Sequence, residues 1–111
     1  MIRKKVFIME ENKWADYVVS AVKRGPGSGR ISQVQVHVDR GNSLGHPEIV
    51  DKMKVAHNIK KGKKYITAYK ISETNWKPGE SIRAFVQDGE AFIRNDDNKV
   101  PLDNLGTLPD I

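Results

Sequence analysis

Residues 14–40, WADYVVSAVKRGPGSGRISQVQVHVDR, decide the fold of this chain of 111 residues. The first part, residues 14–24, favours a strand because it is rich in β-branched and aromatic side chains and contains no breaker. The last part, VQVHV at residues 34–38, alternates valines with polar side chains, which is the period of a half-buried strand. Between them, GPGSG at residues 25–29 has the composition of a turn. The stretch therefore predicts a β-hairpin.

A helix is predicted downstream of the hairpin, after the breaker GNSLG at residues 41–45. Apolar residues recur at helical spacing over residues 47–61, and Pro47 suits a first helical turn. Lysines in the last turn, followed by Gly62, are typical of a helix C-terminus. Residues 65–71, rich in Tyr, Ile and Thr, then predict another strand.

Turn signals divide the remainder of the chain. Lys77-Pro78-Gly79-Glu80 has the pattern of a type II turn, with proline and glycine at its two central positions. Residues 82–86 and 90–94 predict a hairpin across Asp88-Gly89, a dipeptide typical of two-residue hairpin turns.

These elements predict an α+β fold in one domain over residues 14–111. We expect an antiparallel, strongly bent sheet of four or five strands with one helix, in the order β-β-α-β-β-β, and a small open barrel is the alternative shape. Residues 1–13 form either an N-terminal extension or an edge strand. The expected core consists of Val18, Val22, Val34, Val36, Val38, Ile49, Met53, Ala56, Ile66, Ala68, Ile82, Ala84, Val86 and Leu105.

The composition excludes several classes of site. The chain has no cysteine, which rules out disulfides, zinc–thiolate centres and cysteine nucleophiles. No apolar run approaches the length of about 18 residues that a membrane span needs. The N-terminal apolar run, Val6–Met9, is shorter than the core of a secretory signal. We therefore expect no membrane association and a cytoplasmic protein.

Charge is distributed unevenly along the chain. Residues 1–70 contain 15 Lys and Arg against 6 Asp and Glu, a balance of +9, whereas residues 71–111 contain 4 against 8, a balance of −4. Such asymmetry is expected if a basic face binds nucleic acid. It is equally expected if the acidic third folds back over the basic part. In the first case the nucleic-acid-binding residues are Lys23, Arg24, Arg30, Lys52, Lys60, Lys61, Lys63 and Lys64.

No catalytic or metal-binding pattern stands out. His37, His46 and His57 do not have the spacing of metal ligands, and none of the serines lies in a nucleophile motif. We expect no metal, no cofactor and no enzyme activity. A small-ligand binder or enzyme that uses His37 and residues 41–46 remains a further hypothesis.

Two other features point to interactions. Trp76, beside the Pro78-Gly79 pair, is a candidate anchor for a protein partner together with Tyr69 and Arg94, because aromatic and arginine side chains are enriched at interfaces. The tail at residues 103–109, DNLGTLP, has the composition of a docked segment. We expect Asp103 or Asn104 to close a local turn, the leucines to dock, Gly106 to permit a bend and Pro109 to stop pairing.

Taken in order, these motifs resemble a family of small bacterial and phage proteins known as domain of unknown function 3892. The resemblance runs from about Tyr17 to the C-terminus and leaves residues 1–13 outside it. It implies a compact, stand-alone domain and supplies no activity, substrate or catalytic residue. The motifs that carry it are Tyr17–Val22, Ile31, Val34–His37, residues 41–45, the helix to Gly62, Thr67–Tyr69, Trp76, Gly79, Arg94 and Asp103–Pro109.

Size, charge and the absence of a catalytic pattern lead to one functional expectation. The chain is expected to be a small non-enzymatic module that binds another protein, as a regulator or a phage-borne inhibitor. Nucleic-acid binding through the basic residues is the alternative.

Overall fold

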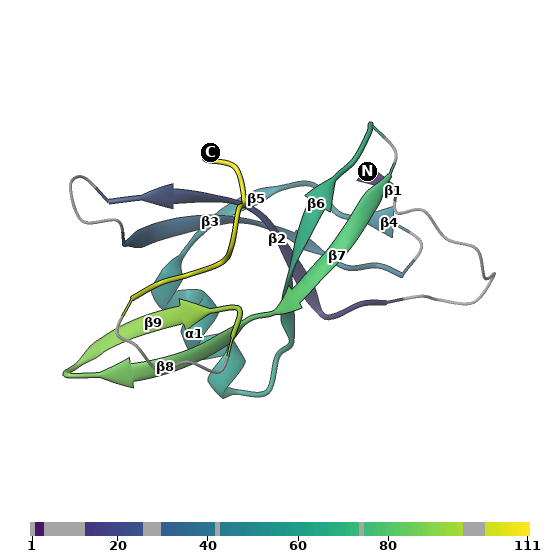
Figure 1. Ribbon diagram of the computed structural model, residues 1–111. Helices are drawn as coiled ribbons and strands as arrows, with labels where there is room; N and C mark the ends of the chain where they lie inside the picture. The colour runs from purple at the N-terminus through teal and green to yellow at the C-terminus, as the bar shows by residue number, and fades with distance from the viewer. Residues whose placement is uncertain (1, 4–12, 26–29, 42, 74, 97–101) are drawn as a thin grey trace.

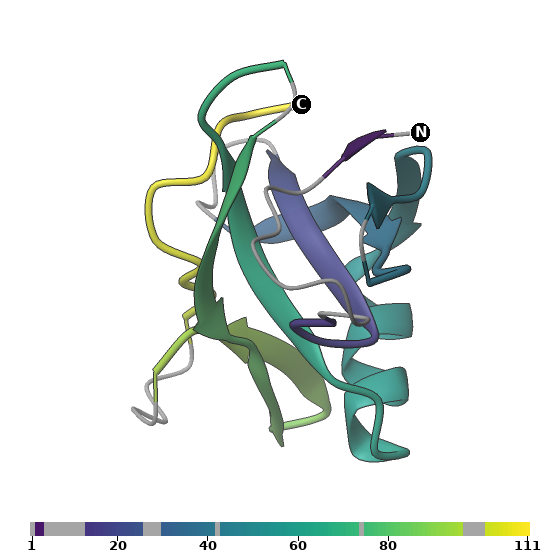
Figure 2. The same ribbon diagram turned by 90° about the vertical axis from the view of Figure 1, so that its right-hand side faces the viewer.

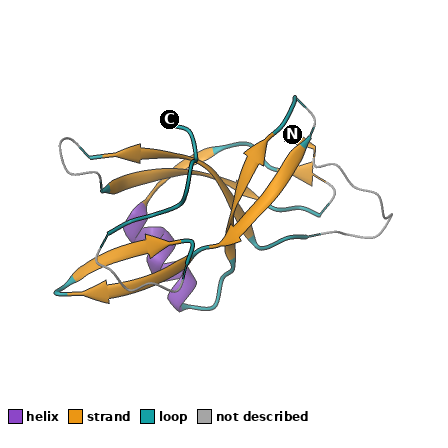
Figure 3. Cartoon of the chain, in the orientation of Figure 1, coloured by secondary structure: helices purple, strands orange, loops and turns teal. Residues whose placement is uncertain are grey.

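The computed structural model describes residues 2–3, 13–25, 30–41, 43–73, 75–96 and 102–111. Within these residues the chain forms one helix and nine strands (Figures 1 and 3). Their bounds are β1 (Ile2–Arg3), β2 (Tyr17–Arg24), β3 (Ile31–Val38), β4 (Ser43–Leu44), β5 (Glu48–Asp51), α1 (Lys52–Lys60), β6 (Tyr65–Lys70), β7 (Trp76–Ser81), β8 (Arg83–Gln87) and β9 (Glu90–Arg94).

The predicted hairpin is the centre of the main sheet. Strands β2 and β3 pair antiparallel, while residues 26–29 of the predicted turn lie outside the described residues. The sheet has the order β5-β3-β2-β6-β7, so its two edges do not pair and the sheet does not close into a barrel.

An all-antiparallel sheet was also the wrong expectation, because β2 and β6 pair in parallel. After the edge strand β5 the chain leaves the sheet through α1 and returns as β6 beside β2 in the same direction, which only a crossover connection allows. The main sheet is therefore mixed.

The helix is shorter than expected, and its residues face differently. Residues 48–51, which were assigned to the helix, instead form β5 and pair with the open edge of β3. Val55 and Ala56 face the core, whereas Met53 is 58% exposed. The C-terminal prediction is confirmed, because Gly62 follows the helix with a φ of 99°, a conformation that favours glycine.

The predicted type II turn is part of a strand. Residues 77–80 lie within β7, where Pro78 pairs with Ala68 on the edge of the sheet. An edge strand tolerates proline because one side of the strand needs no N–H donor. A Cβ atom on Gly79 would collide with Thr67 Oγ1 and the Tyr69 ring, so glycine here serves close packing between strands. With the added strands, the order of elements differs from β-β-α-β-β-β.

The second predicted hairpin is confirmed. Strands β8 and β9 pair antiparallel across Asp88 and Gly89, whose φ values of 53° and 78° fit a turn with two left-handed positions. Figures 1 and 2 show this hairpin and α1 at the same end of the molecule. The helix contacts β3 and β5 of the main sheet as well as both strands of the hairpin.

Two apolar clusters hold these elements together. The larger cluster contains Val19 and Val22 of β2, together with residues of α1, β9 and the C-terminal tail. The smaller cluster, around Val18, Leu44 and Trp76, is formed by other residues of β2, β4, β6 and β7. Four residues of the expected core are wrong because their side chains are exposed: Val38, Ile49, Met53 and Val86.

The tail is docked, as predicted. Leu105 and Leu108 are 1% and 7% exposed, Asn104 Oδ1 accepts the Gly106 N–H at 3.0 Å, and Gly106 has a φ of 77°. Pro109 does not end pairing, because its carbonyl accepts the Val22 N–H at 3.0 Å and the tail runs on beside β2.

The N-terminus contributes one short strand. Ile2–Arg3 forms β1 and pairs antiparallel with β4, whereas residues 1 and 4–12 of the expected extension lie outside the described residues.

Candidate functional site

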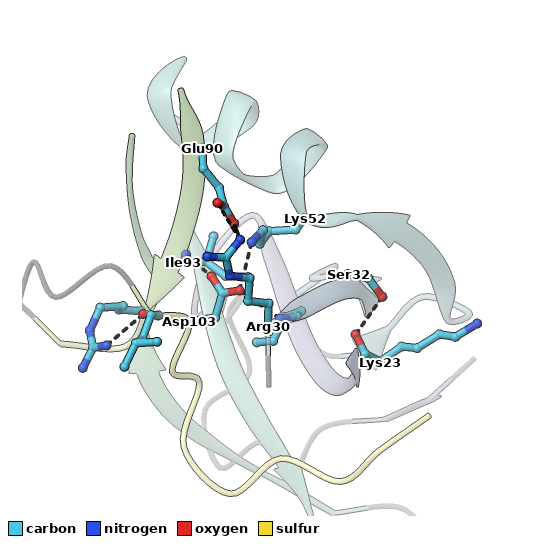
Figure 4. Close-up of polar contacts among 10 residues, drawn as sticks. Lys23, Arg30, Ser32, Lys52, Glu90, Ile93 and Asp103 are labelled. Atoms are coloured by element: carbon cyan, nitrogen blue, oxygen red, sulfur yellow. Dashed lines mark hydrogen bonds and ion pairs between the residues drawn. The ribbon is translucent and has the colours of Figure 1, made fainter. Parts of the chain in front are cut away.

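The acidic third of the chain neutralises part of the basic set. Lys52 Nζ lies 2.9 Å from Asp103 Oδ2, with side-chain exposures of 10% and 0% (Figure 4). Arg30 pairs with Glu90 at 2.5 Å, and this pair is open to solvent. Lys52 therefore belongs to the interior of the fold rather than to a binding surface.

The remaining basic residues lie in two separate groups. Lys60, Lys61, Lys63 and Lys64 are exposed at the C-terminal end of α1, and the Lys64 carbonyl accepts the N–H of Tyr17 at the start of β2. Lys23 and Arg24 lie at the other end of that strand, roughly 23 Å away along its eight residues. The two groups are thus separated by the length of the sheet.

The three expected partner-binding residues are largely enclosed. Trp76 is 6% exposed and meets His37 edge-on, with 5.4 Å between ring centroids. Its indole N–H has no hydrogen-bond partner among the described residues, so its contribution is apolar packing. Arg94 is 7% exposed and is held by Asp96 and the Leu102 carbonyl, each at 2.8 Å. That these three residues form an interface remains a prediction.

An apolar groove of about 540 Å³ lies between α1 and the β8–β9 hairpin. The helix lines it with Met53 and Ile59, and β8 lines it with Phe85 and Val86. Met53 and Val86 are 58% and 64% exposed and lie on opposite walls of the same groove, and apolar side chains gathered in one patch mark interaction sites where single ones do not. Four residues of its lining therefore form an accessible apolar floor.

The rim of this groove is basic. His57 and Lys60 line it from the helix. Residues 52–64 contain six lysines and no Asp or Glu. No Asp or Glu lines the groove among the described residues, and Asp88 and Glu90 of the opposite wall lie in the turn after β8 and at the start of β9. The groove thus combines an apolar floor with positive charge on its helical wall.

A network of polar side chains links β2 and β3. Ser20 Oγ lies 2.9 Å from His37 Nε2, and His37 Nδ1 lies 3.0 Å from the Gly45 carbonyl oxygen. Gln35 Nε2 donates to Ser20 Oγ at 3.0 Å. Ser20 and His37 are 7% and 1% exposed, so this network is buried.

Burial lowers the pKa of His37 below its ordinary value of 6.5. The hydrogen bond to the Gly45 carbonyl opposes this shift, and the positive charge of Lys70 adds to it. The direction of the pKa shift keeps the ring neutral at physiological pH. Because a carbonyl can only accept, the neutral ring carries its proton on Nδ1 and offers Nε2 as an acceptor for the Ser20 hydroxyl.

A second cavity, of about 410 Å³, adjoins this network. Its walls include Ser20, Gln35, Tyr69, Lys70 and Trp76. The last residues of the tail, Pro109–Ile111, complete the wall.

Neither the groove nor the Ser20–His37 network is predicted by the sequence patterns. Helical periodicity placed Met53 in the core, although exposure of such a residue on a short basic helix marks a surface. Ser20 and His37 are 17 residues apart, and only their register across β2 and β3 brings them together. No local pattern indicates this contact, because it depends on the bulge in β2.

Neither a metal cluster nor a membrane-spanning helix occurs in the described ranges. No group of three or more His, Cys, Asp or Glu side chains there could hold a metal ion. No helix of those ranges is long and apolar enough to cross a membrane.

Comparison with known proteins gives one match. No curated protein and no solved structure shows a significant match to this chain. The model of the family described as "Protein of unknown function (DUF3892)" matches residues 10–109. The match begins seven residues before Tyr17, so part of the expected N-terminal extension falls within the family region. Since it covers nearly the whole chain, the protein belongs to this family of unknown function, DUF3892.

Proposed function

We propose that this protein is a small binding module that holds an acidic, amphipathic segment of a partner protein in the groove between α1 and the β8–β9 hairpin. The observation that carries the proposal is the exposure of Met53 and Val86 on the walls of one groove. An apolar groove is the kind of surface that receives the apolar face of an amphipathic helix.

Charge selects the chemistry of the partner. The helix that forms one wall carries lysines and a histidine and has no acidic residue in its first turn. An acidic segment would bring opposite charge to this rim, whereas a basic segment would be repelled. The partner segment is therefore apolar on one side and rich in Asp and Glu on the other.

The pairing of basic residues with the acidic third supports protein binding over nucleic-acid binding. Lys52 and Arg30 are occupied by Asp103 and Glu90, and the two exposed basic groups are separated by the length of β2. Proteins that bind a nucleic-acid backbone usually do so along one continuous basic groove.

A fluorescence-anisotropy titration tests this proposal. The probe is a fluorescein-labelled amphipathic peptide of about four helical turns, with leucines on one face and glutamates on the other. The matched control peptide keeps the leucines and replaces every glutamate with lysine. The acidic peptide should bind and the basic one should not. Equal binding of both peptides, or of neither, would refute the proposal.

Matched variants locate the binding. Val86 and Ile71 are 64% and 65% exposed, but only Val86 lines the groove. V86S should weaken binding of the acidic peptide about five- to tenfold, equivalent to about 1–1.4 kcal/mol, and I71S should leave it unchanged. Equal losses from both variants would place the binding elsewhere.

Nucleic-acid binding through Lys60, Lys61, Lys63 and Lys64 is the second candidate, since these four lysines are exposed together. It predicts affinity for single-stranded DNA that falls steeply with salt, with a log–log slope near −3 if about four phosphates are contacted. The K60E/K63E variant should reduce that slope. Salt-insensitive binding, or no binding at about 50 mM salt, would dismiss this candidate.

A further inference from the structure

The second cavity lies where two neighbours of β2 diverge. Strand β6 pairs with β2 as far as Val19, and the C-terminal tail takes over at Val22. Ser20 and Ala21 occupy the interval between these pairings, and both line the cavity. Main-chain pairing on both sides therefore fixes the position of Ser20 at a gap along one edge of β2.

A bulge also marks this position. In the ladder with β3, Val19 pairs with Val36 and Ala21 pairs with Gln35, so β2 contains an extra residue at Ser20. Bulges re-aim side chains and are frequent beside functional sites. Here the bulge lets Val19 and Val22 join the same core while Ser20 Oγ meets His37 on the other face.

The direction of each hydrogen bond follows from chemistry. The Gln35 amide N–H donates to Ser20 Oγ, and the Gly45 carbonyl accepts from His37 Nδ1. Because the Gln35 and Gly45 hydrogen bonds fix the direction at the two ends of this series, the Ser20 hydroxyl donates to His37 Nε2. A hydroxyl, a neutral imidazole and a group that orients the imidazole are the three parts of an activated serine.

We propose that Ser20 is a nucleophile, with His37 as its general base, toward small carboxylic esters that enter the 410 Å³ cavity. This activity is separate from the groove and does not depend on partner binding.

The reaction proceeds in two balanced steps. Ser20 Oγ bonds to the ester carbonyl carbon while its proton passes to His37 Nε2. The bond from that carbon to the alkoxy oxygen then breaks, and the leaving alcohol takes the proton from His37. Water attacks the acyl-serine in the same way, so that the carboxylic acid leaves and the Ser20 hydroxyl is restored.

The cavity walls offer contacts for the substrate. Tyr69, Trp76 and Pro109 offer aromatic and apolar contact for an acyl chain. Lys70 and Asp110 also line the cavity, and the Lys70 ammonium pairs with Glu73 at 3.5 Å. Gln35 and Gly45 are positioning groups, since they set the direction of the hydrogen bonds.

Covalent labelling of the full chain tests the proposal without any variant. The protein is incubated with an alkyl fluorophosphonate, and the modified residue is located by peptide mass spectrometry. A single adduct on Ser20 supports the proposal. Absence of an adduct, or an adduct confined to other residues, overturns it.

Variants assign the roles. H37Q should slow both labelling and hydrolysis of 4-nitrophenyl acetate about 100-fold, the lower end of the effect of a general base. S20A should abolish both, and S32A, which changes an exposed serine bonded to the Lys23 carbonyl, should change neither. Thermal melts establish that each variant is folded. Labelling of folded H37Q at the rate of the unmodified protein would overturn the role of His37.

Discussion

Replacing Asp103 should destabilise the fold more than any other change of a charged residue in the tail. Asp103 Oδ2 accepts the Ile31 N–H and the Lys52 ammonium, and Oδ1 accepts the Ile93 N–H, each at 2.9 Å (Figure 4). One side chain thus joins the tail to the start of β3, the first turn of α1 and the middle of β9.

The magnitude follows from burial. The Asp103 side chain is fully buried and that of Lys52 is 10% exposed, so D103N leaves an ammonium group with little water and no anion. Breaking a buried ion pair from one side costs about 3–5 kcal/mol. A domain of this size has a total stability of about 5–15 kcal/mol, so D103N should remove about a fifth of it or more.

Urea denaturation followed by circular dichroism measures this loss, read as a lower midpoint at an unchanged slope. E90Q is the matched control, because the Arg30–Glu90 pair is solvent-exposed and should change the free energy of unfolding by about 1 kcal/mol or less. In the double variant K52M/D103N, removal of the unpaired charge should recover about 1–3 kcal/mol relative to the sum of the single changes. A loss below about 1 kcal/mol for D103N, or strict additivity with K52M, would refute the reasoning.

Three further predictions concern the tail, the sheet edge and the buried histidine. L105A should cost about 2–5 kcal/mol in urea denaturation because Leu105 is 1% exposed, and a change within about 0.5 kcal/mol would mean that the tail is not docked. G79A should lower the free energy of unfolding by about 1–3 kcal/mol, because the new Cβ forces β6 and β7 apart. G45A is the control and should cost less, because its Cβ would meet no atom closer than 3.5 Å. Equal losses for the two variants would contradict the packing argument. The lowered pKa of His37 means that the unfolded chain takes up a proton first as the pH falls, so stability should decline from about pH 6.5 downward until the folded-state pKa is passed. Chemical denaturation at several pH values should show this decline, H37Q should lack it, and an NMR titration giving His37 a pKa above 6.5 would contradict it.

Local patterns predicted the elements whose pairing is local. The alternation of valines and polar residues over residues 34–38 sufficed for β3, and Asp88-Gly89 sufficed for the β8–β9 turn. In both cases the partner strand is the next one along the chain, so turn chemistry and periodicity determine the pairing together.

Elements that depend on distant partners were not predictable in this way. Residues 48–51 suit a helix or a strand, and the open edge of β3 decides for the strand. The tail was recognised as docked from its leucines, but the partners of Asp103 lie 72, 51 and 10 residues away, so a local turn was the natural expectation. Likewise, contact between Ser20 and His37 requires the bulge in β2, for which the sequence carries no local signal.

The central claim is that the groove between α1 and the β8–β9 hairpin is the binding surface of this protein. The most direct test is a ¹⁵N–¹H NMR titration of the labelled chain with the acidic amphipathic peptide. The account predicts that shift changes concentrate on groove residues, Met53 to Lys60 of the helix and Ala84 to Ala91 of the hairpin. Changes confined to other surfaces, or a spectrum that the peptide leaves unaltered, would contradict it.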